Sequence, residues 1–189
     1  MNGRDLVGAP HELNAARVVL YGPRPEFGPI IVASINRSLP GLRFIGWGQR
    51  ERPEEFGAEF IAHDLKLWAR GEYLAYYAFE RDTGAYVGRV DLHSWDFATP
   101  RCEVGYVGDV LTAGRGLMRE AVLACVELAF KLGAARVQAL SEADNHRALH
   151  FAEHALGFTR EGVLRNYERD VRGRLGEQVM FAACRPGAA

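Results

Sequence analysis

The sequence predicts a single mixed α/β (α+β) domain with six to seven strands and about four helices. Apolar runs of strand length alternate with stretches of helical periodicity along the 189 residues. A D-T-G turn at 82–84 joins two of the strand-like runs into an antiparallel hairpin. No linker, repeat or low-complexity tract divides the chain, and its 48% of apolar residues are enough to bury a substantial core.

Residues 1–14 are polar or small and predict a flexible N-terminal arm, so the domain is expected to span 15–189. In chain order, the expected elements are a strand at 17–21, a helix at 26–38, a loop at 39–52, a helix at 53–70, strands at 72–80, 85–93 and 102–107, a helix from Leu117, a strand at 136–140, a helix at 145–156, and strands near 158–165 and 177–183.

Several of these elements carry clear local signals. Residues 17–21 are rich in β-branched side chains and end at a G-P-R-P turn, whereas Pro29 fits the helix at 26–38 only in its first turn. Pro53 begins a helix whose apolar residues lie near helical spacing. Residues 72–80 are almost continuously apolar, which predicts a strand buried on both faces.

The strand at 85–93 alternates in polarity. Val90 and Leu92 are expected to face the core, because successive side chains of a strand point to opposite faces. Arg89, Asp91 and His93 are expected to face outward.

Composition excludes several classes of function. The net charge is −1, from 23 basic and 24 acidic residues, so no broad field favours nucleic acid or an anionic membrane. The sequence has no signal-peptide core and no apolar run of membrane-spanning length, which predicts a cytoplasmic protein. Cys102, Cys125 and Cys184 fit no metal-binding spacing and are expected to be reduced, buried thiols.

The stretch from Glu103 to Leu132 is the most informative part of the chain. It reads as a strand, breaks at T-A-G-R-G, and restarts as a helix near Leu117. Gly114 and Gly116 allow a tight turn and close approach to the main chain. Because the first N–H groups of a helix lack internal partners, this turn can cradle an anion. The alternative is a plain strand-to-helix connection.

The same stretch resembles the acetyl-CoA-binding core of the GNAT N-acetyltransferases, in particular the branch that acetylates the N-termini of proteins, including ribosomal proteins. In that branch a strand of the form A-E-I-G-Y-W leads into Q-G-K-G-Y-A-T-E-A. The corresponding segments here read C-E-V-G-Y-V and A-G-R-G-L-M-R-E-A. Asn145, the L-G-F at 156–158 and the E-G-V-L-R at 161–165 resemble the branch's later motifs, so the likeness covers residues 17 to 183.

This resemblance implies the GNAT fold, a central mixed, mostly antiparallel twisted sheet flanked by helices. It implies an N-acetyltransferase that uses acetyl-CoA as co-substrate and a primary amine as acceptor, with a protein N-terminal α-amine as one candidate. Small amines such as a polyamine or an aminoglycoside stay open as acceptors. No metal, nucleic acid or membrane partner is expected, and a homodimer is allowed. The alternative is a GNAT-fold module that binds or senses CoA without turnover.

The resemblance also implies which residues bind the cofactor. Main-chain groups of the turn would hold the phosphates, and the preceding strand would hold the pantetheine arm. The residues that it implies are Val107, Gly108, Val110, Ala113, Gly114, Arg115, Gly116, Leu117, Met118 and Asn145. The family usually has Gln or Arg at the position of Ala113 and Gly or Ala at that of Met118, and these departures favour the non-catalytic alternative. Asn145 is equally suited to capping a helix.

Three residues are candidates for proton transfer. Glu103 is the first candidate base, because carboxylates on the corresponding strand serve as bases in several GNAT enzymes and Gly105 beside it leaves room for a substrate. Its structural alternative is a glutamate bonded to a neighbouring strand or loop. Glu161 is the second, with a salt bridge to Arg160 or Arg165 as its structural alternative. No acid is visible in the helix after Asn145, so Tyr106 or water is considered as the donor to the departing thiolate.

Two further features need an interpretation. Trp47 lies between two glycines, in a loop that helps to wall the acceptor pocket in the related branch; the alternative is an ordinary aromatic anchor. The histidines His146, His150 and His154 recur every four residues, but they lie opposite the apolar side of their helix. A solvated row is expected rather than a metal site.

Overall fold

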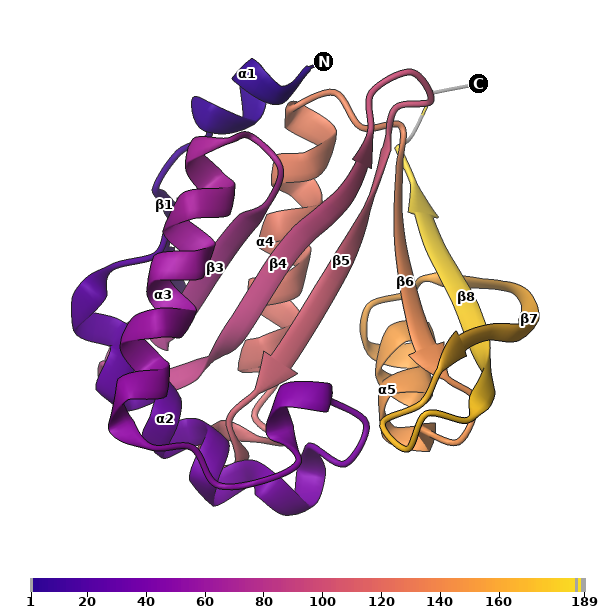
Figure 1. Ribbon diagram of the computed structural model, residues 1–189. Helices are drawn as coiled ribbons and strands as arrows, with labels where there is room; N and C mark the ends of the chain where they lie inside the picture. The colour runs from indigo at the N-terminus through magenta and orange to yellow at the C-terminus, as the bar shows by residue number, and fades with distance from the viewer. Residues whose placement is uncertain (1, 186, 188–189) are drawn as a thin grey trace.

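An eight-stranded sheet runs through the molecule and carries helices on both faces (Figure 1). The structure is a computed structural model that describes residues 2–185 and 187. The strands are β1 (Glu12–Asn14), β2 (Val18–Tyr21), β3 (Leu74–Glu80), β4 (Tyr86–Asp96), β5 (Arg101–Gly108), β6 (Arg136–Glu142), β7 (Thr159–Arg169) and β8 (Leu175–Cys184). The helices are α1 (Gly3–Val7), α2 (Gly28–Ser38), α3 (Glu54–Ala69), α4 (Leu117–Lys131) and α5 (His146–His150), and α5 continues into a π-helical turn, Phe151–Ala155.

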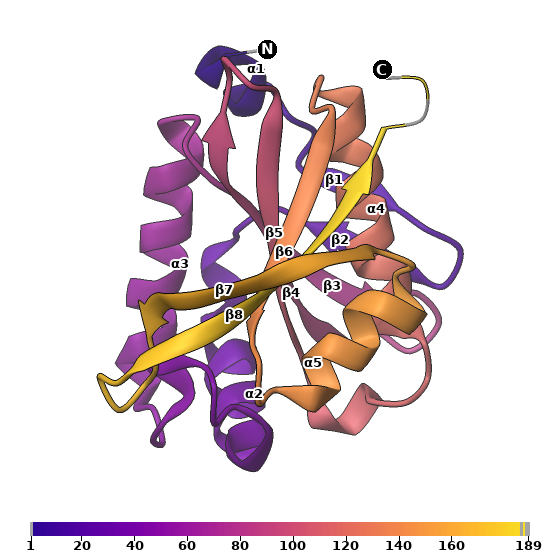
Figure 2. The same ribbon diagram turned by 90° about the vertical axis from the view of Figure 1, so that its right-hand side faces the viewer.

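The strand order is β1-β2-β3-β4-β5-β6-β8-β7, and every neighbouring pair is antiparallel except β5 and β6. This confirms the mixed, mostly antiparallel sheet that the resemblance implies. Figure 2 shows α2 and α3 on one side of the sheet and α4 and α5 on the other, and shows the fan of strand directions that the twist produces.

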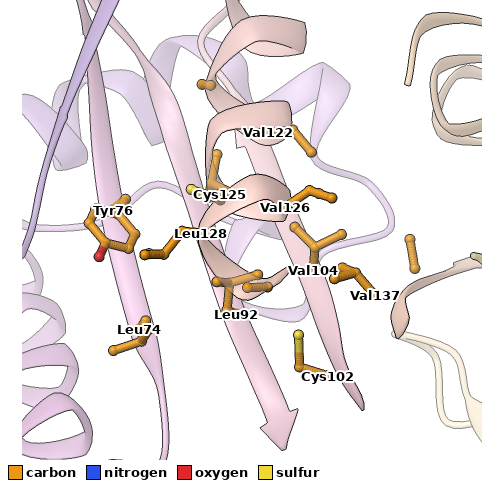
Figure 3. Packing of buried hydrophobic residues seen from close by; sticks show 14 of the residues in the cluster. Leu74, Tyr76, Leu92, Cys102, Val104, Val122, Cys125, Val126, Leu128 and Val137 are labelled. Carbon is orange, nitrogen blue, oxygen red and sulfur yellow. The ribbon is translucent and has the colours of Figure 1, made fainter. Parts of the chain in front are cut away.

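Both faces of the central strands are buried. On one face, Leu74, Tyr76 and Leu92 form a cluster with Cys125 and Val126 of α4 (Figure 3). The other face packs against α2 and α3, and the buried members of that cluster are Ile31, Ile35, Leu42, Ile61, Ala75, Tyr77 and Tyr86. The prediction that residues 72–80 form a strand buried on both sides is confirmed.

The outward orientation expected for Arg89 and Asp91 is wrong. Both side chains lie under α3 and are about nine-tenths buried. Arg89 forms ion pairs with Asp91 and with Asp64 of α3, where its Nη2 lies 2.9 Å from Oδ1. Burial alone would raise the pKa of Asp91, but the Arg89 charge and the contact with His93 hold that pKa below its usual value. The alternation of β4 separates two faces correctly, but both of them are interior.

The N-terminal arm differs from its expectation, since residues 3–14 are packed against the domain. Asn2 and Asp5 form a capping box at the start of α1, and Leu6 is fully buried in the core on the α4 face. The strand β1 pairs with β2 and adds an eighth strand to the sheet. A one-turn helix and a three-residue strand are too short for periodicity to reveal. The described part of the chain leaves out residue 1 of the predicted arm and residues 186, 188 and 189 of the predicted domain.

The parallel strands β5 and β6 stay together over only three pairs of residues. These pairs are Arg101 with Arg136, Cys102 with Val137 and Glu103 with Gln138. Beyond them the two strands diverge, as Figure 1 shows, while β6 remains paired with β8. Among the residues that the structure describes, the edge of β5 that faces β6 therefore has no sheet partner after Glu103, and its main-chain groups are available to a ligand.

Within the described residues, no helix combines the length and the apolar character needed to cross a membrane.

Candidate functional site

The turn between β5 and α4 has the geometry of an anion cradle. Gly114 and Gly116 both adopt a left-handed φ of 77°, which glycine accepts without strain. A side chain at Gly114 would meet no atom within 4 Å, so the turn is open above that residue. No side chain caps the N-terminus of α4, and the N–H groups of its first turn remain for an anion. The residues present therefore fit a diphosphate.

Two arginines hold the cradle in place. Arg115 forms an ion pair with Glu80 at the end of β3, with Nη1 3.0 Å from Oε2. Arg17 donates its main-chain N–H to Glu120 at 2.9 Å and donates Nη1 to the carbonyl oxygen of Arg115 at 3.0 Å. Arg17 is 98 residues away from Arg115 in sequence, and no local motif could have identified it. It adds a positive charge directly beside Gly116, where a Cβ would lie 3.2 Å from its Nη2.

The two departures from the family motif leave the cradle open. Ala113 is exposed and adds no bulk. Met118 is half-buried and turns toward the sheet. A Cβ built on Gly88 would lie 2.9 Å from its sulfur, and a Cβ built on Gly108 would lie 3.6 Å from its Cγ. Leu117 is buried in the core, so it can offer a ligand only its main chain.

An arginine at position 113 would supply the side chain that the family usually has there. We expect Ala113→Arg to tighten CoA binding by roughly 1–2 kcal/mol, because it adds one charge-assisted hydrogen bond to phosphate. Calorimetry measures the affinity, and Ala98→Arg, in the exposed turn after β4, controls for the added charge. Equal affinities in all three proteins would mean that another residue, such as Arg115, already makes the contact.

The end of β5 lies between the cradle and a small cavity. Gly108 pairs with Gly88 of β4, and the Val107 side chain lines the cavity. The N–H of Val110 donates to the hydroxyl of Ser38 at 3.2 Å, so this group is not available to a cofactor. The Val110 side chain is half-exposed and remains the part of that residue that a ligand could touch.

The two candidate bases differ in their surroundings. Glu103 lies where β5 and β6 begin to diverge, and its Oε1 accepts a hydrogen bond from Nε2 of Gln138 at 3.2 Å. Glu161 is exposed on β7 and forms a two-pronged ion pair with Arg136, at 2.7 and 2.6 Å. This pairing with Arg136 lowers the pKa of Glu161, which makes it a poorer base.

A polar chain connects these two carboxylates. Nε of Arg136 donates to Oε1 of Gln138 at 3.2 Å, which turns the amide nitrogen of Gln138 toward Glu103. Glu161 in turn fixes Arg136. The salt bridge expected for Glu161 with Arg160 or Arg165 is thus made with Arg136 instead, because β6 and β7 both flank β8 and bring the two side chains together. Glu161 acts on Glu103 only through two intermediate residues.

The neighbourhood of Gly105 differs from its expectation. A Cβ at Gly105 would lie 2.6 Å from Oδ2 of Asp91, so the space above this glycine belongs to that carboxylate and not to a substrate. His93 lies opposite Glu103 in the pairing of β4 with β5. Its Nδ1 is 2.9 Å from Oδ2 of Asp91 and its Nε2 is 3.8 Å from Oε2 of Glu103. The polarity pattern of β4 predicts an outward His93 and indicates no role for it.

The place where β5 and β6 diverge, after the pair Glu103 and Gln138, is called the split here, and that pair marks its apex. Tyr106 and Asn145 lie on the α5 side of the split. The Tyr106 ring packs on Phe151, with ring centroids 5.1 Å apart, and burial raises the pKa of its phenol to about 12. It is therefore a neutral donor at neutral pH. Oδ1 of Asn145 accepts the N–H of Ala148 at 3.3 Å, as expected of a helix cap, and this leaves its amide nitrogen for a second partner.

Trp47 lines the small cavity on the α2 side of β5. Its ring contacts Phe60 of α3 edge-on, with centroids 5.5 Å apart, and its carbonyl oxygen accepts Nε of Arg52 at 2.8 Å. The lining residues are Ile31, Ser34, Ile35, Ser38, Leu42, Trp47, Phe60, Tyr86, Arg89, Val107 and Gly108. The cavity, at about 20 Å³, has room for little more than a water molecule.

Trp47→Ala tests whether this loop borders the acceptor. We expect the apparent KM for the amine to rise about two- to tenfold, the equivalent of the roughly 0.5–1.5 kcal/mol that an aromatic contact contributes. The affinity for CoA should stay nearly unchanged. Steady-state kinetics and calorimetry give the two values, with Trp95→Ala on β4 as a matched loss of an indole. Equal losses of amine and CoA binding would identify Trp47 as a structural anchor.

The histidine row of α5 is exposed. His146, His150 and His154 all lie at the surface, and the rings of His150 and His154 stack with centroids 4.4 Å apart. No group of three or more metal-ligating side chains occurs in the part of the chain that the structure describes.

Comparison with known proteins gives one family. The model of the acetyltransferase (GNAT) domain matches residues 18–159, more than half of the chain. No curated protein sequence matches.

Several solved structures share the fold. The microcin C7 self-immunity acetyltransferase MccE, solved with acetyl-CoA and AMP, is 18% identical with a TM-score of 0.82, over 90% of this chain and 94% of its own. The ribosomal L7/L12 α-N-protein acetyltransferase RimL, solved with coenzyme A, is 18% identical with a TM-score of 0.80, over 92% and 97%. The ribosomal-protein-S5-alanine acetyltransferase from Vibrio fischeri is 17% identical with a TM-score of 0.76, over 94% and 98%. With the fold in agreement with the family match, the chain belongs to the GNAT acetyltransferase family.

Proposed function

We propose that the chain is an acetyl-CoA-dependent N-acetyltransferase whose acceptor is a primary amine, and specifically the α-amine of a peptide or protein N-terminus. The observation that carries the proposal is the placement of three features along β5. The anion cradle follows the end of the strand, the unpaired edge runs along it, and Glu103 lies at the apex of the split. Relatives of the same fold act on ribosomal-protein N-termini, which supports this choice of acceptor.

The reaction needs three contributions from the protein. The cradle at 113–118 would bind the phosphates, and the free edge of β5 would hold the pantetheine by main-chain hydrogen bonds. The amine would reach the apex from the side of α2 and α3, where Glu103 lies. Glu103 would accept one proton from the ammonium, directly or through a water, and the free amine nitrogen would then attack the thioester carbonyl. The departing thiolate would gain a proton as the tetrahedral intermediate collapses, with Tyr106 or water as the donor.

The choice of an α-amine as the acceptor rests on the free-energy cost of deprotonating the amine. At pH 7 a lysine side chain lies about three units below its pKa, so deprotonation costs roughly 4–5 kcal/mol, whereas an α-amine costs only about 1–1.5 kcal/mol. Tyr106 is held neutral, and of the two candidate bases only Glu103, which accepts a hydrogen bond from Gln138, lies at the split. Such a site suits the acceptor that is easier to deprotonate.

An acceptor screen tests the proposal. Peptides with a free N-terminus, the same peptides with a blocked N-terminus and an internal lysine, and a polyamine are each incubated with acetyl-CoA. Thiol release gives the rate and mass spectrometry locates the acetyl group. We expect acetylation at the free N-terminus and little at lysine. Acetylation of lysine or polyamine alone would support the assignment as an N-acetyltransferase but contradict the choice of an α-amine as acceptor. The cytoplasmic location and a homodimer stay predictions.

A further inference from the structure

His93 lies between two carboxylates at the apex of the split. Its Nδ1 is buried, and Oδ2 of Asp91 at 2.9 Å is the polar atom beside it. Because Nδ1 makes no hydrogen bond that meets the usual geometry with any residue that the structure describes, the contact is chiefly electrostatic. Its Nε2 faces Oε2 of Glu103 at 3.8 Å. The acetyl transfer proposed above uses Glu103 and leaves the imidazole without a function.

Each carboxylate is held so that one oxygen remains for the imidazole. Arg89 pairs with Oδ1 of Asp91, which leaves Oδ2 beside His93 and against Gly105. Gln138 donates to Oε1 of Glu103, which leaves Oε2 toward the ring. The glycine at 105 gives Asp91 the space that this orientation requires.

We propose that Asp91, His93 and Glu103 form a proton relay that carries the acceptor's proton away from the split. The inference rests on the proposed function and deepens it. Glu103 contacts the amine and is the catalytic residue, whereas His93 is a positioning and relay residue that acts through it.

Each proton of the acceptor has a defined destination in this relay. The ammonium N–H bond breaks and an O–H bond forms on Glu103, and this proton then passes to Nε2 of His93. The free amine nitrogen forms a bond to the thioester carbonyl carbon, the C–S bond breaks, and the second proton of the nitrogen reaches the CoA sulfur through Tyr106 or water. The 3.8 Å gap exceeds a hydrogen bond, so a rotation of the Glu103 side chain or one bridging water closes it. The His93 side chain is 32% exposed and can release its proton to solvent.

The charges around the ring set the pH at which it can accept a proton. Burial disfavours the charged imidazolium, but the contact with Asp91 and the charge of Glu103 outweigh burial and the opposing charge of Arg89. The pKa of His93 is therefore raised above its usual value. On the β3 side, Tyr73 stacks on the ring with centroids 5.7 Å apart, and Asp64 of α3 reaches only Arg89. The relay works with a neutral ring, so kcat/KM should rise with pH through this raised pKa.

Kinetics of His93→Gln provide the first test, with His63→Gln on the exposed side of α3 as the control. We expect kcat/KM at neutral pH to fall at least about tenfold in His93→Gln. The rise of kcat/KM with pH through the pKa of His93 should be lost, and CoA affinity should stay unchanged. His63→Gln should behave like the wild-type protein. A His93→Gln enzyme with the wild-type rate and pH profile would overturn the relay while leaving the acetyltransferase assignment intact. No acetyl transfer by the wild-type protein to any amine would overturn the proposed function itself.

Nuclear magnetic resonance gives a readout that does not depend on activity. The ring signal that disappears in His93→Gln identifies His93 among the six histidines. It should titrate above about 6.5 in the wild-type protein, and its midpoint should fall in Glu103→Gln because one neighbouring negative charge is lost. If His93→Gln does not fold, His93→Asn serves for the assignment. A midpoint that is the same in the wild-type protein and in Glu103→Gln would show that the two groups are not coupled and would overturn the relay.

Discussion

Glu103→Gln should lower kcat by about 10²–10⁴, the range that general-base catalysis contributes. The new amide keeps the shape of the side chain, and its oxygen can still accept the hydrogen bond from Gln138. It cannot take a proton from the amine. CoA affinity should stay unchanged, because the cradle is at the other end of β5. Thiol-release kinetics and calorimetry measure the two effects separately.

Glu161→Gln is the matched control, since it makes the same change in charge at the far end of the polar chain. It removes the ion pair with Arg136 and should have only a small effect on kcat, through the position of Gln138. Full activity in Glu103→Gln together with loss of activity in Glu161→Gln would transfer the role of base to Glu161. Full activity in both variants would mean that the enzyme captures an amine already deprotonated in solution.

Gly116→Val should weaken CoA binding by about 10- to 100-fold. A branched side chain blocks close approach of the phosphates to the main chain, and the loss of one charge-assisted hydrogen bond at roughly 1.5–3 kcal/mol accounts for a change of this size. Valine is also strained at the φ of 77°, and its Cβ would lie 3.2 Å from Nη2 of Arg17. Calorimetry on the folded variant gives the affinity.

Backbone strain is separated from ligand contact by Gly173→Val. Gly173 has a φ of 78° in the turn between β7 and β8, and a side chain there meets no atom within 4 Å. Both variants should lose similar stability in thermal unfolding, but only Gly116→Val should lose CoA affinity. Wild-type CoA affinity in a folded Gly116→Val protein would show that the phosphates do not bind at this turn.

The parts of the site that could be predicted are those encoded locally. The β5 strand, its glycine turn and the start of α4 follow one another in sequence, so pattern and spacing are sufficient to place them. The buried strand β3 and the helix after Pro53 likewise follow from the spacing of their apolar residues.

The parts that could not be predicted depend on which elements become neighbours. The cradle includes Arg17, which lies just before β2 and reaches the turn only through the fold. The alternation of β4 could not reveal that the face with Arg89 and Asp91 is buried and paired with Asp64 of α3. The link from Glu103 to Glu161 depends on the pairing of β5 with β6 and on β7 beyond them, and no spacing within one strand contains that register.

A crystal structure of the protein with bound acetyl-CoA tests the account most directly. We expect pyrophosphate oxygens within hydrogen-bond distance of the N–H groups of residues 114–118, the pantetheine along the free edge of β5, and the acetyl group at the apex of the split beside Glu103. A pyrophosphate bound away from this turn, or an acetyl group remote from Glu103, would contradict both the cradle and the base.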